Sequence, residues 1–157
     1  MKRLICLILF LIFSLTGCAK PQEDTCQFYY LRTAETIRYG QEDALIAPVS
    51  REITGQDSSL DYLLQLYLDG PSESNFISPF PRSTYLLSIL WEEDTLVLVV
   101  SREFSTLEEM DLTLAGACLA ATCHKLAGAE QIQVRSGDNV YEFDLHNFAF
   151  LDGSTDQ

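Results

Sequence analysis

Residues 60–71 read LDYLLQLYLDGP and have the clearest secondary-structure pattern in the sequence. Its apolar side chains recur at spacings i, i+3, i+4, i+7 and i+8, which place them in one stripe along a helix. They are Leu60, Leu63, Leu64, Tyr67 and Leu68. Ser58 or Ser59 caps the start of the helix. Gly70-Pro71 ends it, because glycine accepts a left-handed C-terminal cap and proline cannot continue a helix. The pattern predicts a helix that lies with one face on a sheet.

Short β-prone segments surround this helix on both sides. Pro48 predicts an edge position for the second of them, because proline lacks the N–H that a central strand must donate. The segments 85–91 and 96–100 flank Glu92-Glu93-Asp94-Thr95 and predict a hairpin whose second strand, nearly all apolar, is central and covered on both faces. The expected strands are residues 26–32, 44–53, 85–91, 96–100, 131–135 and 140–143.

A second helix is predicted from about Thr106 to Leu126, with Gly128 as its stop. Ser105-Thr106 opens it, and the acidic residues that follow suit the positive end of the helix dipole. Its middle, residues 114–121, is small and apolar, which lets a helix approach a sheet closely. The order β-(β)-α-β-β-α-β predicts an α/β (α+β) fold, a two-layer sandwich with two helices packed on one face of a mixed sheet.

The N-terminus has the pattern of a secretory signal. Lys2 and Arg3 precede an apolar run of ten residues, 4–13. That run is shorter than the roughly 20 residues that a membrane-spanning helix needs. The sequence predicts a signal peptide over residues 1–17, and the alternative is a signal anchor that stays uncleaved.

Residues 15–18, Leu-Thr-Gly-Cys, resemble the lipobox of bacterial lipoproteins. The resemblance implies cleavage between Gly17 and Cys18, and a lipid on Cys18 that holds the chain on the extracytoplasmic face of the cell membrane. Two acyl chains anchor a protein stably, whereas one does so only marginally. An ordinary secreted protein with a chance cysteine at this position is the alternative.

The charge balance excludes one class of partner. Ten basic and 23 acidic residues give a formal net charge of −13. Such a chain has no electrostatic attraction for phosphate, so no nucleic-acid partner is expected. The 157 residues are enough for one domain.

The remaining cysteines and the two histidines do not form a recognisable chemical site. Cys26, Cys118 and Cys123 are an odd number, and one of the last two could pair with Cys26. A spacing of five on a helix turns Cys118 and Cys123 roughly 140° apart, so they cannot share an ion and are interpreted as core or edge thiols. Neither His124 nor His146 stands in a nucleophile or glycine-rich motif. We therefore expect no catalytic residue, metal or cofactor, and no enzyme activity.

Four landmarks after the lipobox resemble the GerMN domain of bacterial spore-formation and germination lipoproteins. The first three are residues 28–31 (FYYL), residues 45–53 (LIAPVSREI) and residues 63–71 (LLQLYLDGP). The third resembles the family's helix that ends in Leu-x-Gly-Pro. The fourth is the later half of the chain, which begins at Pro81 and includes residues 99–104 (VVSREF), Ala121-Thr122 and residues 132–134 (IQV). The resemblance divides the chain into a signal peptide (1–17), a tether (18–25), a GerMN-like domain (26–143) and an acidic tail (144–157), which the family pattern lacks.

The resemblance implies a non-catalytic, membrane-anchored domain that helps to assemble protein complexes in sporulation or spore germination. It offers no catalytic residue to transfer. The alternative is a lipoprotein that binds a small ligand or cell-wall fragment in the Ser72–Ser83 loop region, and the ligand-binding residues are unknown. A flat exposed sheet edge would favour assembly, whereas a deep pocket with converging polar groups would favour a ligand.

Overall fold

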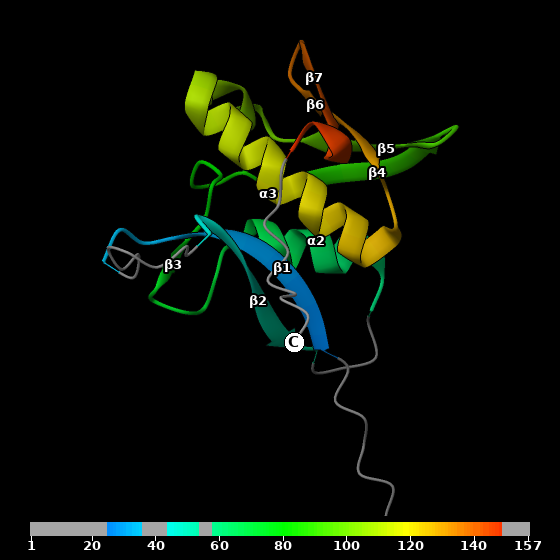
Figure 1. The fold of residues 1–157 in the computed structure, drawn as a ribbon. Coiled ribbons are helices and arrows are strands. Elements are labelled where there is room, and N and C mark those ends of the chain that lie inside the picture. Colours follow the sequence, from blue (N-terminus) through cyan, green and yellow to red (C-terminus); the bar gives the residue numbers. More distant parts are fainter. Residues whose placement is uncertain (1–24, 36–43, 54–57, 149–157) are drawn as a thin grey trace, which may run out of the picture.

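The computed structural model describes residues 25–35, 44–53 and 58–148, and Figure 1 shows their arrangement. The strands are β1 (Thr25–Arg32), β2 (Ile46–Glu52), β3 (Phe76–Ile77), β4 (Leu86–Glu92), β5 (Thr95–Val100), β6 (Gln131–Ser136) and β7 (Asn139–Asp144). The helices are α2 (Leu60–Leu68) and α3 (Glu109–Ala127), with short 3-10 helices η1 (Arg102–Thr106) and η2 (Leu145–Asn147). Cys18, Gly17 and the rest of the predicted signal and tether up to residue 24 lie outside the described residues.

The predicted α+β class is confirmed, but the strands form two sheets where the sequence predicted one. The first sheet has the antiparallel order β2-β1-β3, and the second has the order β4-β5-β6-β7, with β5 and β6 parallel. In Figure 1, α3 runs between the two sheets. It contacts β1 on one side and β6 and β7 on the other, so the helices do not share one face of a single sheet.

Helix α3 is suited to this middle position by its small side chains. Nine consecutive residues, Ala115 to Cys123, are buried. A helix that covers a sheet with one face would bury only a stripe. Burial all around shows that α3 is covered from several directions, which the sequence did not indicate.

Along part of β1, side chains of helices α2 and α3 form the hydrogen bonds that a neighbouring strand would otherwise form. The backbone N–H of Tyr29 donates to Thr122 Oγ1 of α3 at 2.9 Å, and the Tyr67 hydroxyl of α2 donates to the Tyr29 carbonyl, also at 2.9 Å. Strand β3 pairs with β1 only at Leu31 and Arg32. Side-chain oxygens therefore satisfy backbone groups that a longer sheet would pair, which is why the two sheets remain separate.

The predicted helix is confirmed over residues 60–68, although its start has no side-chain capping hydrogen bond. Ser59 occupies the N-cap position, and Leu63, Leu64, Tyr67 and Leu68 are buried. Gly70 has a φ of +98°, so the glycine stop is also confirmed.

We expect Gly70→Val to lower the free energy of unfolding by about 1–2 kcal/mol, because a β-branched residue is strained at positive φ. A Cβ at this position would meet only Ser78 Cβ at 3.7 Å, so strain and not overlap causes the loss. Denaturant midpoints measure it, and Gly70→Asn is the control, since asparagine tolerates this conformation. Equal midpoints for Gly70→Val and the wild type would contradict the prediction.

The start of α3 was predicted three residues too early. Ser105 and Thr106 belong to η1, where the Ser105 hydroxyl donates to the Arg102 carbonyl and the Thr106 hydroxyl to the Glu103 carbonyl. Such local bonds compete with helix initiation, so Glu108 takes the N-cap position instead. The predicted stop at Gly128 is confirmed by its φ of +70°.

The second sheet follows the predicted strands closely. β4 and β5 form the expected hairpin around Glu93-Asp94, and β5 lies between β4 and β6 with Leu96, Val97 and Leu98 buried. The folded structure extends past residue 143, where the sequence predicted the domain to end. Leu145 and Phe148 pack against the core, and the Leu145 N–H donates to the Glu130 carbonyl. The predicted tail boundary remains a prediction, because residues 149–157 lie outside the described part.

The three cysteines of the described residues are buried, and for Cys118 and Cys123 this supports the core position over the edge position. Cys26, Cys118 and Cys123 are all free thiols, so neither of the two open pairings with Cys26 is formed. Burial raises the pKa of Cys118 and of Cys123 to about 12, which makes both thiols unreactive near neutral pH.

Candidate interaction surface

The four outer strands of the two sheets differ in how their free edges are protected. Strand β2 carries the exposed Pro48, which confirms the predicted edge position, and β3 is only two residues long. Strand β7 carries the acidic residues Glu142 and Asp144. Proline, shortness and charge are all known ways to prevent a sheet edge from pairing with another chain.

Strand β4 lacks these protections. It has seven residues with no proline, glycine or basic side chain, and its only charged residue is the terminal Glu92. Leu87 is 58% exposed and Trp91 49% exposed. A long apolar edge of this kind is a site for pairing with another chain.

Nearby aromatic side chains enlarge the apolar area. Tyr85 just before β4 and Tyr62 on α2 are both exposed, and Tyr62 and Leu87 line the same groove. We call Tyr62, Tyr85, Leu87 and Trp91, together with the free backbone edge of β4, the β4 edge surface.

The pairing register indicates which backbone groups of β4 point outward. Hydrogen-bonded and non-hydrogen-bonded pairs alternate along an antiparallel ladder, and a two-residue turn closes on a hydrogen-bonded pair, here Glu92 with Thr95. The alternation directs the N–H and C=O groups of Ile89 and Trp91 away from β5. At the other end of the strand, beyond a bulge between Leu86 and Ser88, the Leu86 N–H donates to Gln65 Oε1 at 2.9 Å.

Two open grooves lie beside this edge, one on each side of Gln65. The larger, of about 630 Å³, lies between the first part of α2 and residues 86–89 of β4. The smaller, of about 480 Å³, lies between the end of α2 and residues 81–85. The smaller groove includes Ser78, Pro81, Arg82 and Ser83 of the loop region that the sequence suggested for a ligand.

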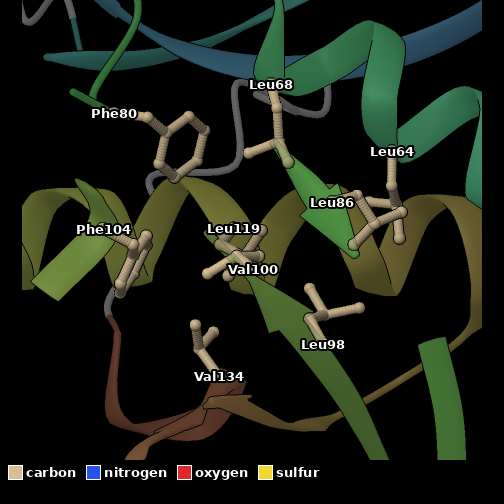
Figure 2. A pocket seen from close by; sticks show the side chains of 9 residues that line it. All are labelled: Leu64, Leu68, Phe80, Leu86, Leu98, Val100, Phe104, Leu119 and Val134. Atoms are coloured by element: carbon tan, nitrogen blue, oxygen red, sulfur yellow. The ribbon is translucent and has the colours of Figure 1, made fainter. Parts of the chain in front are cut away.

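The cavity that the described residues enclose between α2 and the second sheet is too small for a ligand. Figure 2 shows nine apolar side chains that surround a cavity of about 10 Å³, roughly the size needed for one water molecule. They are Leu64, Leu68, Phe80, Leu86, Leu98, Val100, Phe104, Leu119 and Val134. With no polar group in this lining, the cavity is a packing defect of the core.

The solvent-facing side of the second sheet is polar. Arg135 forms a 2.7 Å ion pair with Glu92 across β5, and its Nε donates to Gln133 Oε1 at 2.7 Å. Gln133 in turn donates to Glu142 of β7 at 3.4 Å. This polar network contrasts with the apolar β4 edge, where Leu87 and Trp91 are exposed, although Val140 of β7 is 57% exposed as well.

The two histidines lie at the surface and line neither groove. His124 is exposed in the last turns of α3, and His146 in η2 has its Nε2 atom 3.5 Å from Glu130 Oε2. Within the part of the chain that the structure describes, no three His, Cys, Asp or Glu side chains gather in a way that could hold a metal ion.

None of the described helices is long and apolar enough to cross a bilayer. Cys18, the predicted attachment point for a lipid, lies outside the described residues.

The sequence interpretation missed the residues of the β4 edge surface. It placed Tyr85–Trp91 in an apolar strand but gave no reason to separate an edge strand from a central one. Tyr62 belongs to the polar face of α2. It becomes part of the apolar surface only because β4 lies beside that face.

Comparison with known proteins points to one family. The family model Germane, described as "Sporulation and spore germination", matches residues 27–142. The solved first GerMN domain of the sporulation protein GerM from Bacillus subtilis is similar with a TM-score of 0.57 and 12% identity, over 75% of this chain and 86% of that one. A search of curated proteins found no significant match.

The solved tandem GerMN domains of the same Bacillus subtilis protein give a TM-score of 0.56 and 14% identity, over 79% of this chain. This chain spans only 43% of the tandem structure. At these identities, the two structures support the similarity of the fold alone.

Proposed function

The chain belongs to the Germane (GerMN) family of sporulation and spore germination domains, and on that basis we propose that it is a lipid-anchored assembly protein on the extracytoplasmic face of the cell membrane. The family match covers most of the described residues. The family is not known for a catalytic activity. We infer that the role of this chain lies in binding to other proteins.

One observation carries the assembly role: β4 is a long apolar edge without the proline, shortness or charge that mark β2, β3 and β7, and α2 is bonded to it at the Leu86 N–H. Soluble proteins avoid such edges unless they pair with something. The grooves beside β4 are open, and the interior cavity is too small for a ligand. These features support protein binding more than capture of a small molecule.

The assembly role predicts that charge at the β4 edge abolishes function without unfolding the domain. We expect Leu87→Lys combined with Trp91→Lys to fail to complement a deletion strain, because an ammonium group buried against an apolar partner is costly. Both side chains are about half exposed, so the free protein should keep its circular dichroism spectrum and lose less than about 1 kcal/mol of stability.

The matched control is the double change His124→Gln and His146→Gln, which alters two exposed positions away from the grooves. It should fold and complement normally. A histidine variant that folds but loses all function would contradict the assembly role and reopen the enzyme or ligand interpretation.

The anchoring role depends on Cys18. We expect Cys18→Ala to leave an unlipidated precursor that still carries residues 1–17, because the alanine offers no thiol for the lipid. Detergent partitioning and the mass of the intact protein measure this. Wild-type protein that is freely soluble and begins at another residue would contradict the lipid anchor.

The second candidate function is binding of a small ligand or cell-wall fragment in the smaller groove. Its support is that Arg82, Ser78 and Ser83 line one groove of about 480 Å³. An Arg82→Gln variant that loses function while the β4 variants retain it would favour this candidate.

A further inference from the structure

The groove beside β4 has the form of a helix and a free strand edge lying side by side. Residues 60–65 of α2 face residues 86–89 of β4, and residues 65–69 face residues 81–85. The helix and the strand therefore run in opposite directions, with Gln65 between the two grooves. This arrangement leaves a channel along the edge of the sheet.

The channel has a row of polar side chains on its helix side. Asp61, Gln65 and Asp69 are spaced i, i+4 and i+8, so they follow one another along one face of α2. Gln65 is held in place at both ends of its amide: Oε1 accepts from Leu86 N–H at 2.9 Å, and Nε2 donates to Asp69 Oδ1 at 2.9 Å. The helix is thus fixed against the start of β4.

This fixed helix limits what can pair with β4. Because Gln65 already takes the Leu86 N–H, backbone pairing is available only from the bulge onward, at Ile89 and Trp91. A second folded sheet approaching edge to edge would meet α2, whereas the groove of about 630 Å³ between α2 and residues 86–89 leaves space for a single extended segment. Addition of one strand to a sheet edge is a common mode of peptide recognition.

Charge distinguishes the two ends of the channel. Asp61 lies on the groove that reaches Ile89, and β4 continues from there into the acidic turn residues Glu93 and Asp94, while Glu92 is already paired with Arg135. At the opposite end, the groove that Asp69 lines also carries the basic side chain of Arg82. Only the Asp61 end therefore favours a basic partner residue.

We propose that an extended segment of a partner protein, with apolar side chains at alternate positions and a lysine or arginine at the end beside Asp61, adds as a fifth strand to β4. This proposal rests on the assembly role above and names the kind of partner. The segment runs antiparallel to β4, so its basic residue lies near its N-terminus. Backbone bonds to Ile89 and Trp91 give the affinity, and contacts with Tyr62 and Leu87 select the apolar side chains.

The test uses full-length protein in detergent and a labelled peptide of about eight residues, enough to span β4. The peptide has lysine at its N-terminal end and valine alternating with threonine. Fluorescence anisotropy measures its dissociation constant. Replacing the lysine by glutamate should weaken binding about tenfold, and a central proline should abolish it by removing a donor from the ladder.

Two protein variants test the polarity of the channel. Asp61→Asn should weaken binding of the lysine peptide about threefold at low salt and leave a threonine-substituted peptide unaffected. Arg82→Gln, at the other end, is the matched control and should not weaken binding of the lysine peptide. Equal losses for both variants would overturn the assigned direction.

Amide hydrogen exchange gives the decisive readout. Bound peptide should protect the Ile89 and Trp91 amides, which point outward, while Leu90, already paired with β5, changes little. Binding without protection at Ile89 and Trp91 would overturn strand addition. Protection that appears without peptide, together with a dimer in sedimentation, would assign the edge to a second copy and also overturn the proposal.

Failure of this proposal can be told apart from failure of the assembly role. If no peptide binds but the Leu87→Lys and Trp91→Lys double variant still loses complementation, the assembly role stands and only the extended partner is wrong. If the peptide binds but that double variant complements normally, the edge is a peptide site without the proposed role in assembly.

Discussion

Replacing Gly116 by valine is expected to lower the free energy of unfolding by about 3 kcal/mol, enough to remove much of the stability of a small domain. Gly116 lies in the buried middle of α3, and a Cβ there would overlap ring atoms Cδ1 and Cε1 of Phe143 on β7. Helix propensity favours the substitution by only a few tenths of a kcal/mol, so the overlap dominates. Urea denaturation measures the loss.

Phe143→Leu provides the partner variant in a double-mutant cycle. It should be destabilising alone but should recover part of the loss in the Gly116→Val background, because the smaller side chain leaves room for the added methyl groups. Gly128→Ala is the matched glycine control: nothing lies within 4 Å of its Cβ position, and its cost of about 1 kcal/mol comes from the positive φ alone. Additive losses in the cycle would show that Gly116 and Phe143 do not touch.

Tyr67→Ala is expected to cost about 3–5 kcal/mol, the usual range for removing a large buried aromatic ring. The Tyr67 ring lies between Phe28, Tyr30 and Phe80, with centroid distances of 5.5, 5.0 and 5.2 Å. Its hydroxyl bonds to the Tyr29 carbonyl, and its own carbonyl accepts from the Tyr30 hydroxyl at 2.8 Å. The substitution therefore leaves a cavity and also removes one hydrogen bond between α2 and β1.

Tyr67→Phe separates the ring from the hydroxyl and should cost about 1–2 kcal/mol. Burial raises the pKa of Tyr67 well above its usual value, so in the folded protein the phenol stays protonated where the unfolded chain ionises. The stability that this protonated phenol contributes is present below pH 10 and is lost as pH rises further. Tyr67→Phe should weaken the fall in stability above pH 10, and an unchanged alkaline profile would contradict this origin.

The sequence was sufficient where local rules decide the structure. The apolar stripe and the Gly70-Pro71 stop define α2 through neighbouring residues alone, and two apolar runs around Glu93-Asp94 define the β4–β5 hairpin. The continuous apolar run of β5 also indicated its central position. In each case the determining residues lie within about ten positions of one another.

The division into two sheets could not be predicted because it depends on distant contacts. Thr122 looks like an ordinary polar residue in a small apolar stretch, and nothing near it indicates a bond to Tyr29. The edge position of β4 is equally invisible, since an apolar strand has the same composition at an edge or in the centre. Asp61 and Gln65 look like the solvated face of a helix, and only the position of β4 turns that face into one wall of a channel.

The bond between Tyr29 and Thr122 also has a kinetic consequence. It joins residues 93 positions apart, so β1 cannot complete its edge until α3 has been made and has docked. Contacts of such long range slow folding, because the chain loses loop entropy before it gains the contact. A chain that ends before Glu109 would hold β1 with an edge open to other chains, and such intermediates aggregate readily. Refolding should therefore be slow, and its yield should fall as protein concentration rises.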